Sequence, residues 1–297
     1  MTSGAPPEPL GVVAGGGDLP LRVAEAALAT GRPVHVILLD GFAEPRLWRA
    51  HAARCATFRL GATGTAVLWM RARGVRDLVM AGRVARPSIL ALRPDAPTAK
   101  LLARIGRRAF GGDDGLLSAL REVLREEGFR LVGPDALLAG LQAPPGLLTP
   151  GLAPDALAMS DVARGVAVLR ALGVADVGQA VVVQTGLVLA VEAIEGTDAM
   201  LARAGSLRRE GAPGGVLVKL AKPGQDRSLD MPALGPATVA GAAAAGLRGV
   251  AFEAGSALVL DREATAREAT ARGLFLLAVR PDDHMPPAAA NPGGTTR

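Results

Sequence analysis

The sequence predicts an α/β protein with an N-terminal Rossmann-like parallel-sheet domain and a C-terminal mixed α/β (α+β) domain. Three observations lead to this fold class. The chain opens with an apolar strand, a glycine-rich turn, a helix and a second strand, as a parallel α/β sheet does. A segment rich in proline and glycine, 143–154, interrupts the middle of the chain. Beyond it, two apolar runs joined by Thr185-Gly186 predict a β-hairpin.

Composition narrows the class of protein. The 297 residues are enough for two domains, and a hydrophobic content of 49% indicates a globular chain. Aromatic residues make up 3% and tyrosine is absent, so we expect no nucleic-acid surface built on base stacking. A net charge of +5 suits an anionic small molecule or an acidic membrane surface.

The chain carries no sign of export. Cys55 is the only cysteine, which excludes an internal disulfide and favours a reducing compartment. The first residues lack the basic and apolar regions of a secretory signal, and no apolar run reaches membrane-spanning length. We therefore expect a cytoplasmic protein, with peripheral contact to the inner membrane left open.

The N-terminal domain is expected over residues 10–142, after a flexible tail at 1–9. Alternating or continuous apolar runs predict its strands, and amphipathic stretches with turn residues at their ends predict its helices. The expected strands are 10–13, 33–39, 57–60, 77–81 and 130–132, and the expected helices are 21–30, 64–73, 116–127 and 134–141.

Residues 143–154 are expected to be the linker, since their prolines and glycines permit neither helix nor ladder. The C-terminal domain follows over 155–280, and 281–297 is expected to be a flexible tail. Its predicted helices are 155–172, one from 199 capped by Thr197 or Asp198, 236–245 and 262–272. Its predicted strands are 180–184, 187–192, 216–220, 249–252, 257–260 and 275–279.

The first candidate site is the glycine turn at Gly15, Gly16 and Gly17, followed by Asp18. Glycines let backbone N–H groups approach a phosphate at a helix N-terminus. Arg83 follows the strand 77–81, at the sheet edge where ligands of open α/β sheets bind. The match to a dinucleotide fingerprint is imperfect, because Pro20 replaces the third glycine. A tight turn without a ligand is the alternative.

The second candidate site runs through 216–235. The predicted strand 216–220 contains Lys219 and leads into a loop with Lys222, Asp226 and Asp230, so that these four charged residues fall within a dozen positions. Paired carboxylates suit a divalent cation or a positioned water, and lysines neutralise phosphate oxygens. A solvated polar turn is the alternative. Two acidic groups lie elsewhere: Glu192, Glu195 and Asp198 near a turn, and Asp113 and Asp114, of which one is a natural N-cap.

Five segments of the chain form an ordered set: A-G-G-G-D-L-P at 14–20, A-G-R-V-A-R-P at 81–87, G-D-D at 112–114, E-G-T-D-A-M-L at 195–201 and K-P-G-Q-D-R-S-L-D-M-P at 222–232. This set resembles the LpxI family of UDP-2,3-diacylglucosamine pyrophosphatases. The resemblance implies a homodimeric hydrolase of lipid A biosynthesis that uses Mg²⁺ or Mn²⁺. Its substrate is a UDP-activated diacylated glucosamine, and its products are UMP and 2,3-diacylglucosamine 1-phosphate (lipid X).

The resemblance also assigns residues. Asp230 in L-D-M-P matches the critical acid of the family, and Asp226 ranks second; both are metal-ligand candidates, and the sequence does not separate ligand from base. Lys219 and Lys222 join them as catalytic candidates. The substrate-binding candidates are Gly15, Gly16, Gly17, Asp18, Leu19, Gly82, Arg83, Asp113, Asp114, Glu195, Gly196, Thr197, Asp198 and Gln225.

Two other classes of function stay open. An NAD(P)-dependent Rossmann oxidoreductase would use Gly15 and Gly17 together with Asp40, which ends the second strand where a ribose-binding acid lies. An oxidoreductase of this kind would give no role to the lysines and acidic residues of the second domain. A non-enzymatic lipid or nucleotide carrier would have the same folds and would bind substrate without turnover.

Overall fold

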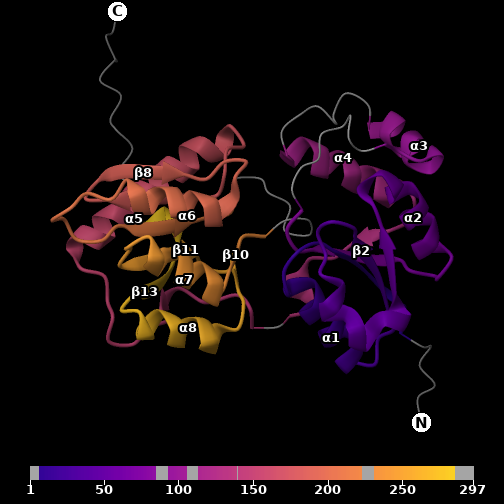
Figure 1. Ribbon diagram of the computed structural model, residues 1–297, viewed down its shortest axis with the longest axis horizontal. Coiled ribbons are helices and arrows are strands. Elements are labelled where there is room, and N and C mark those ends of the chain that lie inside the picture. Colours follow the sequence, from indigo (N-terminus) through magenta and orange to yellow (C-terminus); the bar gives the residue numbers. More distant parts are fainter. Residues whose placement is uncertain (1–6, 85–92, 106–112, 139, 223–230, 285–297) are drawn as a thin grey trace, which may run out of the picture. The chain divides into compact units, whose positions relative to one another are not determined.

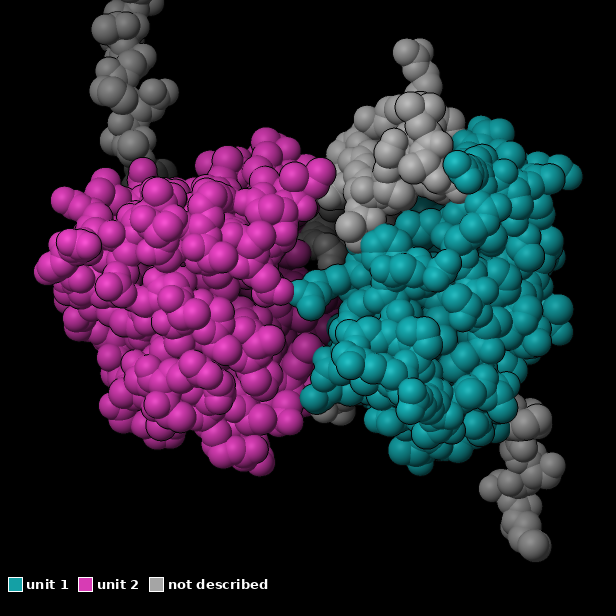
Figure 2. Space-filling view, in the orientation of Figure 1, with its two compact units in different colours: residues 1–139, 226–230 teal, residues 140–225, 231–297 magenta. Residues whose placement is uncertain are grey.

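The computed structural model describes residues 7–84, 93–105, 113–138, 140–222 and 231–284, with the backbone alone at 105 and 113–118. The chain forms two compact units (Figure 2), one within residues 1–139 and the other within 140–225 and 231–297. Each unit has its own sheet and its own hydrophobic core.

The first unit contains a five-stranded parallel sheet in the order β3-β2-β1-β4-β5 (Figure 1). The strands are β1 (Leu10–Ala14), β2 (Val34–Leu39), β3 (Cys55–Phe58), β4 (Asp77–Ala81) and β5 (Arg130–Leu131). The Rossmann-like sheet predicted for this part of the chain is thereby confirmed. Strand order reverses at β1, so the carboxyl ends of β1 and β4 form the topological switch point at which such sheets bind ligands.

Helices cover both faces of this sheet. They are α1 (Leu19–Ala29), α2 (Thr63–Arg71), α3 (Ala96–Ile105) and α4 (Asp113–Glu126), with short 3₁₀ segments η1 (Pro45–Arg54), η2 (Leu60–Ala62) and η5 (Pro134–Ala136). Val23 of α1 packs on one face with Val12 and Val36. Met70 of α2 and Leu101 of α3 pack on the other with Leu78. Strands β1, β2, β3 and β4 therefore supply apolar side chains to two cores, as a buried parallel sheet requires.

Helix α3 was not predicted from the sequence. It contains Pro97, which reads as a helix breaker but lies in the first turn, where proline is tolerated. The carboxylate of Asp95 accepts the N–H of Thr98 at 2.7 Å and so satisfies one of the unpaired donors at the start of the helix. The sequence D-A-P-T was therefore a helix start signal.

The second unit contains a six-stranded mixed sheet in the order β6-β13-β11-β9-β7-β8. Its strands are β6 (Gly146–Leu147), β7 (Ala180–Gln184), β8 (Leu187–Val191), β9 (Val216–Lys219), β11 (Gly249–Glu253) and β13 (Phe275–Val279); β10 (Ala233–Leu234) and β12 (Leu258–Val259) form a separate parallel pair. Strands β9, β11 and β13 are parallel, while β6, β7 and β8 pair antiparallel. The predicted mixed α/β class is confirmed.

Four helices flank this sheet: α5 (Ala156–Val174), α6 (Gly196–Ser206), α7 (Pro236–Ala244) and α8 (Arg262–Ala271). Side chains of a strand alternate between its faces. Val181 and Val218 accordingly pack in the core that contains α5 residues, whereas Val182 and Leu217 pack in the core of α6, α7 and α8. This alternation also decides which face receives the polar residues at the strand ends.

The expected linker at 143–154 is partly built into the second unit, which corrects the prediction that it forms no ladder. Residues 146–149 contain no proline, so their backbone N–H groups can form hydrogen bonds with a strand. Gly146–Leu147 accordingly form β6, which pairs with β13. Ala143 is buried in a core cluster. The hydroxyl of Thr149 accepts the N–H of Leu276 at 3.0 Å. The segment therefore forms one edge of the sheet.

Two further boundaries differ from expectation. Helix α6 begins at Gly196 rather than at 199, and neither Thr197 nor Asp198 serves as its N-cap, which is Glu195. The predicted tail from 281 begins with η6 (Pro281–His284), where Asp282 pairs with Arg170 of α5 at 3.0 Å. This ion pair connects η6 to α5.

Candidate active site

In the first unit, the glycine loop after β1 is bonded to the loop after β4. The N–H of Gly15 donates to the carbonyl of Ala81 at 2.8 Å. Gly16 and Arg83 exchange backbone hydrogen bonds of 2.9 and 3.0 Å. The N–H groups of Gly15 and Gly16 are therefore satisfied within the protein. The assignment of Gly15, Gly16 and Gly17 to substrate binding stays a prediction.

Close approach explains the glycines in these two loops. A Cβ at Gly15 would lie 2.7 Å from the carbonyl oxygen of Arg83, and one at Gly82 would lie 2.7 Å from that of Gly16. Gly82 also has φ +90°, which side chains disfavour. Gly17 has the same φ but open space around it. The sequence pattern is thus explained in part by packing at the switch point.

The residues that follow the loop enter helix α1. Asp18 lies at its N-cap position without making a side-chain cap, and its carboxylate instead pairs with Arg22 at 2.9 Å. Leu19 packs against the core beside α1. The switch point therefore presents the N-terminus of α1, while the N–H groups of Gly15 and Gly16 and the carboxylate of Asp18 already have partners within the protein.

In the second unit, three predicted or candidate residues form a chain of hydrogen bonds whose two end residues are buried. Lys219, the last residue of β9, donates from Nζ to Oγ1 of Thr197 at 3.0 Å. Thr197 donates its hydroxyl to Oε1 of Glu192 at 2.8 Å. Lys219 is 6% exposed and Glu192 8%. The structure thus joins an ammonium group and a carboxylate through one hydroxyl at the carboxyl end of β9.

Strand periodicity places these groups on one face. Ala190 and Leu217 lie two residues before Glu192 and Lys219, and both pack in the core that α6 covers. Side chains two residues apart point the same way, so Glu192 and Lys219 turn toward α6 as well. Thr197 in the first turn of α6 meets them there. Glu192 was noticed in the sequence only as part of an acidic group.

Lys222 takes a different partner. Its Nζ lies 2.5 Å from Oδ1 of Asp176, which follows α5 with φ +57°. The side chain of Lys222 is 9% exposed and that of Asp176 22%. The two lysines of the predicted site therefore contact different groups: Lys219 contacts the hydroxyl of Thr197 in the E-G-T-D segment, and Lys222 contacts the carboxylate of Asp176.

The two acidic residues of the E-G-T-D segment, Glu195 and Asp198, have different surroundings. Glu195 pairs with Arg203 at 2.7 Å, and this hydrogen bond lowers the pKa of the Glu195 carboxyl below its ordinary value. Gly196 has φ +79°, which lets the chain turn into α6. Asp198 lies in the first turn of α6, where its charge complements the helix dipole.

Several predicted residues lie outside the described part of the chain. Gln225, Asp226 and Asp230 fall in 223–230, and the side chains of Asp113 and Asp114 fall in 113–118, where the backbone alone shows α4 beginning at Asp113. Among the described residues there is no group of three or more His, Cys, Asp or Glu side chains that could hold a metal ion. The metal assignment to Asp226 and Asp230 stays a prediction.

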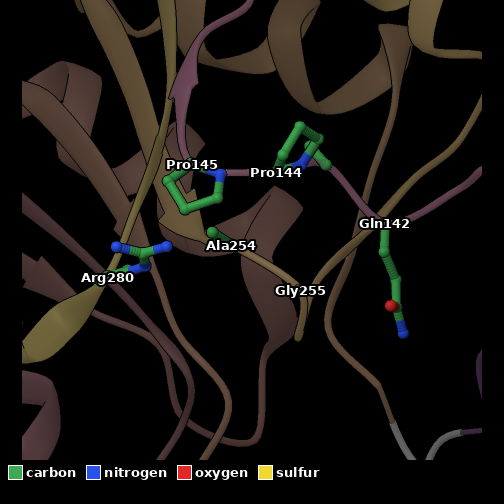
Figure 3. A pocket seen from close by; sticks show the side chains of 7 residues that line it. Gln142, Pro144, Pro145, Ala254, Gly255 and Arg280 are labelled. Carbon is green, nitrogen blue, oxygen red and sulfur yellow. The ribbon is translucent and has the colours of Figure 1, made fainter.

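A pocket of about 390 Å³ opens at the carboxyl ends of β11 and β13 in the second unit (Figure 3). Its lining residues include Pro144, Pro145, Ala254, Gly255 and Arg280. Arg280 directly follows the buried strand β13, and Arg83 follows β4 with Gly82 between them; of these two arginines, only Arg83 was singled out from the sequence. Applying the same rule to β13 would have found it.

Comparison with known proteins covers both units. Residues 9–141 match the family model of the LpxI N-terminal domain, and residues 144–277 match that of the LpxI C-terminal domain. The chain is 41% identical over 280 residues to the UDP-2,3-diacylglucosamine pyrophosphatase LpxI of Caulobacter vibrioides (strain ATCC 19089 / CIP 103742 / CB 15). That alignment covers 92% of this chain and 98% of the relative.

Proposed function

The chain belongs to the LpxI family, and from this we propose that it hydrolyses the pyrophosphate bond of UDP-2,3-diacylglucosamine, giving UMP and 2,3-diacylglucosamine 1-phosphate in lipid A biosynthesis. The observation that carries the proposal is the 41% identity to a named pyrophosphatase across 92% of the chain. A likeness that spans both units supports the whole reaction rather than one binding module.

The described residues suit an anionic substrate. Cleavage of a pyrophosphate builds negative charge on the phosphate that leaves, and preorganised cations stabilise that charge. Lys219 is held at a strand end by Thr197, so its ammonium group does not have to be ordered during the reaction. Lys222 is close to Lys219 along the chain, and its ammonium group is held by the carboxylate of Asp176. These contacts support both lysines as groups that bind the phosphates.

We further propose Asp230 and Asp226 as the acids that bind Mg²⁺ or activate water. When bound, such a cation polarises a phosphoryl oxygen and lowers the pKa of a water molecule. Both residues stand in the K-P-G-Q-D-R-S-L-D-M-P segment, which begins with Lys222 shortly after Lys219. That proximity along the chain supports a single site for the cation and the lysines.

Membrane contact and a homodimer are part of the same proposal. The substrate carries two acyl chains, and the net charge of +5 favours approach to an anionic membrane face. Among the described residues, no helix has the length and apolarity needed to cross a bilayer. The oxidoreductase and carrier alternatives gain no support from the family to which the chain belongs.

The deciding experiment is a turnover assay. Purified protein is incubated with UDP-2,3-diacylglucosamine and Mg²⁺, with and without a chelator, and UMP is measured by chromatography. UDP-N-acetylglucosamine, which lacks the acyl chains, and NADH are controls. We expect UMP from the acylated substrate alone, and loss of that UMP with the chelator. Absence of UMP from folded protein would contradict the proposal.

A further inference from the structure

Glu192 is a buried carboxylate whose two oxygens both have donors. Oε1 accepts the hydroxyl of Thr197 at 2.8 Å, and Oε2 accepts the N–H of Gln179 at 3.3 Å. The backbone N–H of Glu192 donates to the carbonyl of Ala180 at 2.9 Å. A carboxylate this far from water requires such partners, because an unpaired buried charge is costly.

The backbone around Glu192 is fixed by close packing. A Cβ at Gly178 would lie 1.9 Å from the carbonyl oxygen of Glu192, so only glycine fits there. Gly178 also has φ +50°, a conformation that favours glycine. Glu192 therefore follows β8 in one defined position, and its side chain reaches Thr197 from a rigid base.

The direction of the hydrogen bonds follows from the chemistry of the three groups. An ammonium group can only donate, and a carboxylate can only accept. The single hydroxyl proton of Thr197 therefore goes to Glu192, and an oxygen lone pair of Thr197 receives Lys219. Glu192 thus determines which way the Thr197 hydroxyl faces, although the hydrogen bonds place Thr197 between it and the lysine.

We propose that Glu192 is a positioning residue that acts through Thr197 to fix the ammonium group of Lys219 for the phosphates of the substrate. The inference rests on the proposed function, because it takes a pyrophosphate as the group that Lys219 meets. Lysine has a long, flexible stem, so a fixed acceptor reduces the entropy that must be lost on reaching the transition state.

Glu192→Gln tests the direction of the hydrogen bonds that connect Lys219, Thr197 and Glu192. If the amide oxygen continues to accept from Gln179, its NH₂ group faces Thr197 and donates, which turns the hydroxyl proton toward Lys219. Glu263→Gln is the matched control, because it makes the same change of charge at a carboxylate that is 88% exposed on α8. Thr197→Val removes the hydroxyl at nearly constant shape, and Thr197→Ser restores it.

The first readout needs no substrate. Lys100, Lys219 and Lys222 are the lysines of the sequence. With ¹⁵N at the lysine side-chain nitrogens, NMR follows each ammonium group, and Lys219→Arg assigns its signal. We expect Glu192→Gln and Thr197→Val to shift or broaden the Lys219 signal, while the Lys100 signal stays. Thr197→Ser should return it toward its wild-type position. An unchanged Lys219 signal in both variants would overturn the proposal.

The second readout is kinetic. We expect Glu192→Gln to lower kcat by about 10- to 100-fold, as misplacement of a catalytic group does, with a smaller change in KM. In a Lys219→Ala background the same substitution should change kcat by less than about twofold, because the group it positions is gone. An undiminished effect in that background would make Glu192 merely structural. If the wild type releases no UMP, the proposed function fails, and the NMR result still decides the positioning.

Discussion

Gly16 and Arg83 exchange two backbone hydrogen bonds, one of 2.9 Å from Gly16 to Arg83 and one of 3.0 Å in return. This pair closes the loops after β1 and β4 onto each other at the switch point of the parallel sheet. The loops approach this closely because Gly15 and Gly82 carry no Cβ. The geometry of the switch point therefore depends on glycines that contact protein, in addition to any that contact ligand.

The first prediction concerns Gly82. Gly82→Ala should lower the free energy of unfolding by more than the roughly 1–3 kcal/mol expected for a strained backbone alone, because its Cβ meets the carbonyl of Gly16. Gly31→Ala is the control, since Gly31 has φ +77° with no atom within 4 Å of the added Cβ. Urea unfolding measures both. Equal losses would show that the loops can separate without cost.

The second prediction concerns Asp161 of α5. Its carboxylate is 0% exposed and accepts the N–H groups of Thr185 and Gly186 at 3.1 and 2.7 Å. These two residues form the β7–β8 turn with φ values of +50° and +80°. Asp161→Asn would present an amide NH₂ to one of these donors, and we expect a loss of about 1–3 kcal/mol in unfolding free energy.

The control for Asp161 is Asp282→Asn, because the Asp282 side chain is 89% exposed and pairs with Arg170 at the surface. Surface ion pairs contribute little, so this variant should stay within about 0.5 kcal/mol of the wild type. Comparable losses in the two variants would mean that the turn does not need the buried acid.

The third prediction is a pH dependence of stability. Burial raises the pKa of Asp77, but the hydrogen bonds and charges of Arg130 and Arg32 lower it by more, so that it lies below its ordinary value of 3.8. A carboxyl whose pKa is depressed by folding stabilises the protein above the unfolded-state pKa. That contribution is lost as the pH falls through the folded-state value.

Asp77→Asn should therefore destabilise the protein at pH 7 and should lose less of its stability on going to pH 3 than the wild type does. Thermal melting across this range measures the difference, with Asp282→Asn as the variant expected to follow the wild-type curve. Parallel curves for Asp77→Asn and the wild type would show that the two arginine contacts, each 2.5 Å long, do not couple folding to this proton.

Much of the fold could be predicted because local signals agreed with the tertiary structure. Thr185-Gly186 turns between β7 and β8 where the apolar runs end, and Phe275–Val279 is a strand with the predicted bounds. Pro97 in α3 and the prolines around β6 led to wrong predictions of irregular structure. Proline destabilises a helix little when it lies in the first turn, and it destabilises a sheet little when it lies next to a strand as short as β6.

The candidate site was predictable to a smaller extent. Lys219 and Thr197 were named from motifs, but their contact depends on β9 and α6 packing together, which sequence order does not reveal. Glu192 was within reach, since it stands two residues after the buried Ala190 and shares its face. The hydrogen bonds that occupy Gly15 and Gly16 come from a loop some 66 residues away in the chain, so local pattern could not predict them.

The fourth prediction concerns Asp230. Asp230→Ala should reduce kcat by a factor on the order of 1,000 or more, because it removes the acid proposed to bind the cation or activate water, while the fold survives. Asp226→Ala should have the smaller effect. UMP release and circular dichroism are measured on the same samples. Loss of the folded signal in Asp230→Ala would make this residue structural instead of catalytic.

The fifth prediction separates two roles of Lys222. Its ammonium group lies 2.5 Å from Asp176 in a largely buried pair, so Lys222→Met leaves a carboxylate without this partner. We expect the single variant to lose about 1–3 kcal/mol of unfolding free energy together with turnover. Lys222→Met combined with Asp176→Asn removes both charges and keeps at 176 a residue that tolerates φ +57°, so most of the lost stability should return.

Turnover should not return in that double variant if Lys222 also binds phosphate, as we propose. Arg267→Met on α8 is the control, since Arg267 is 71% exposed and pairs with Glu263 at the surface. Unfolding by urea and UMP release, measured on the same preparations, give the two quantities. Recovery of both in the double variant would contradict a catalytic role, because Lys222 would then serve only to neutralise Asp176.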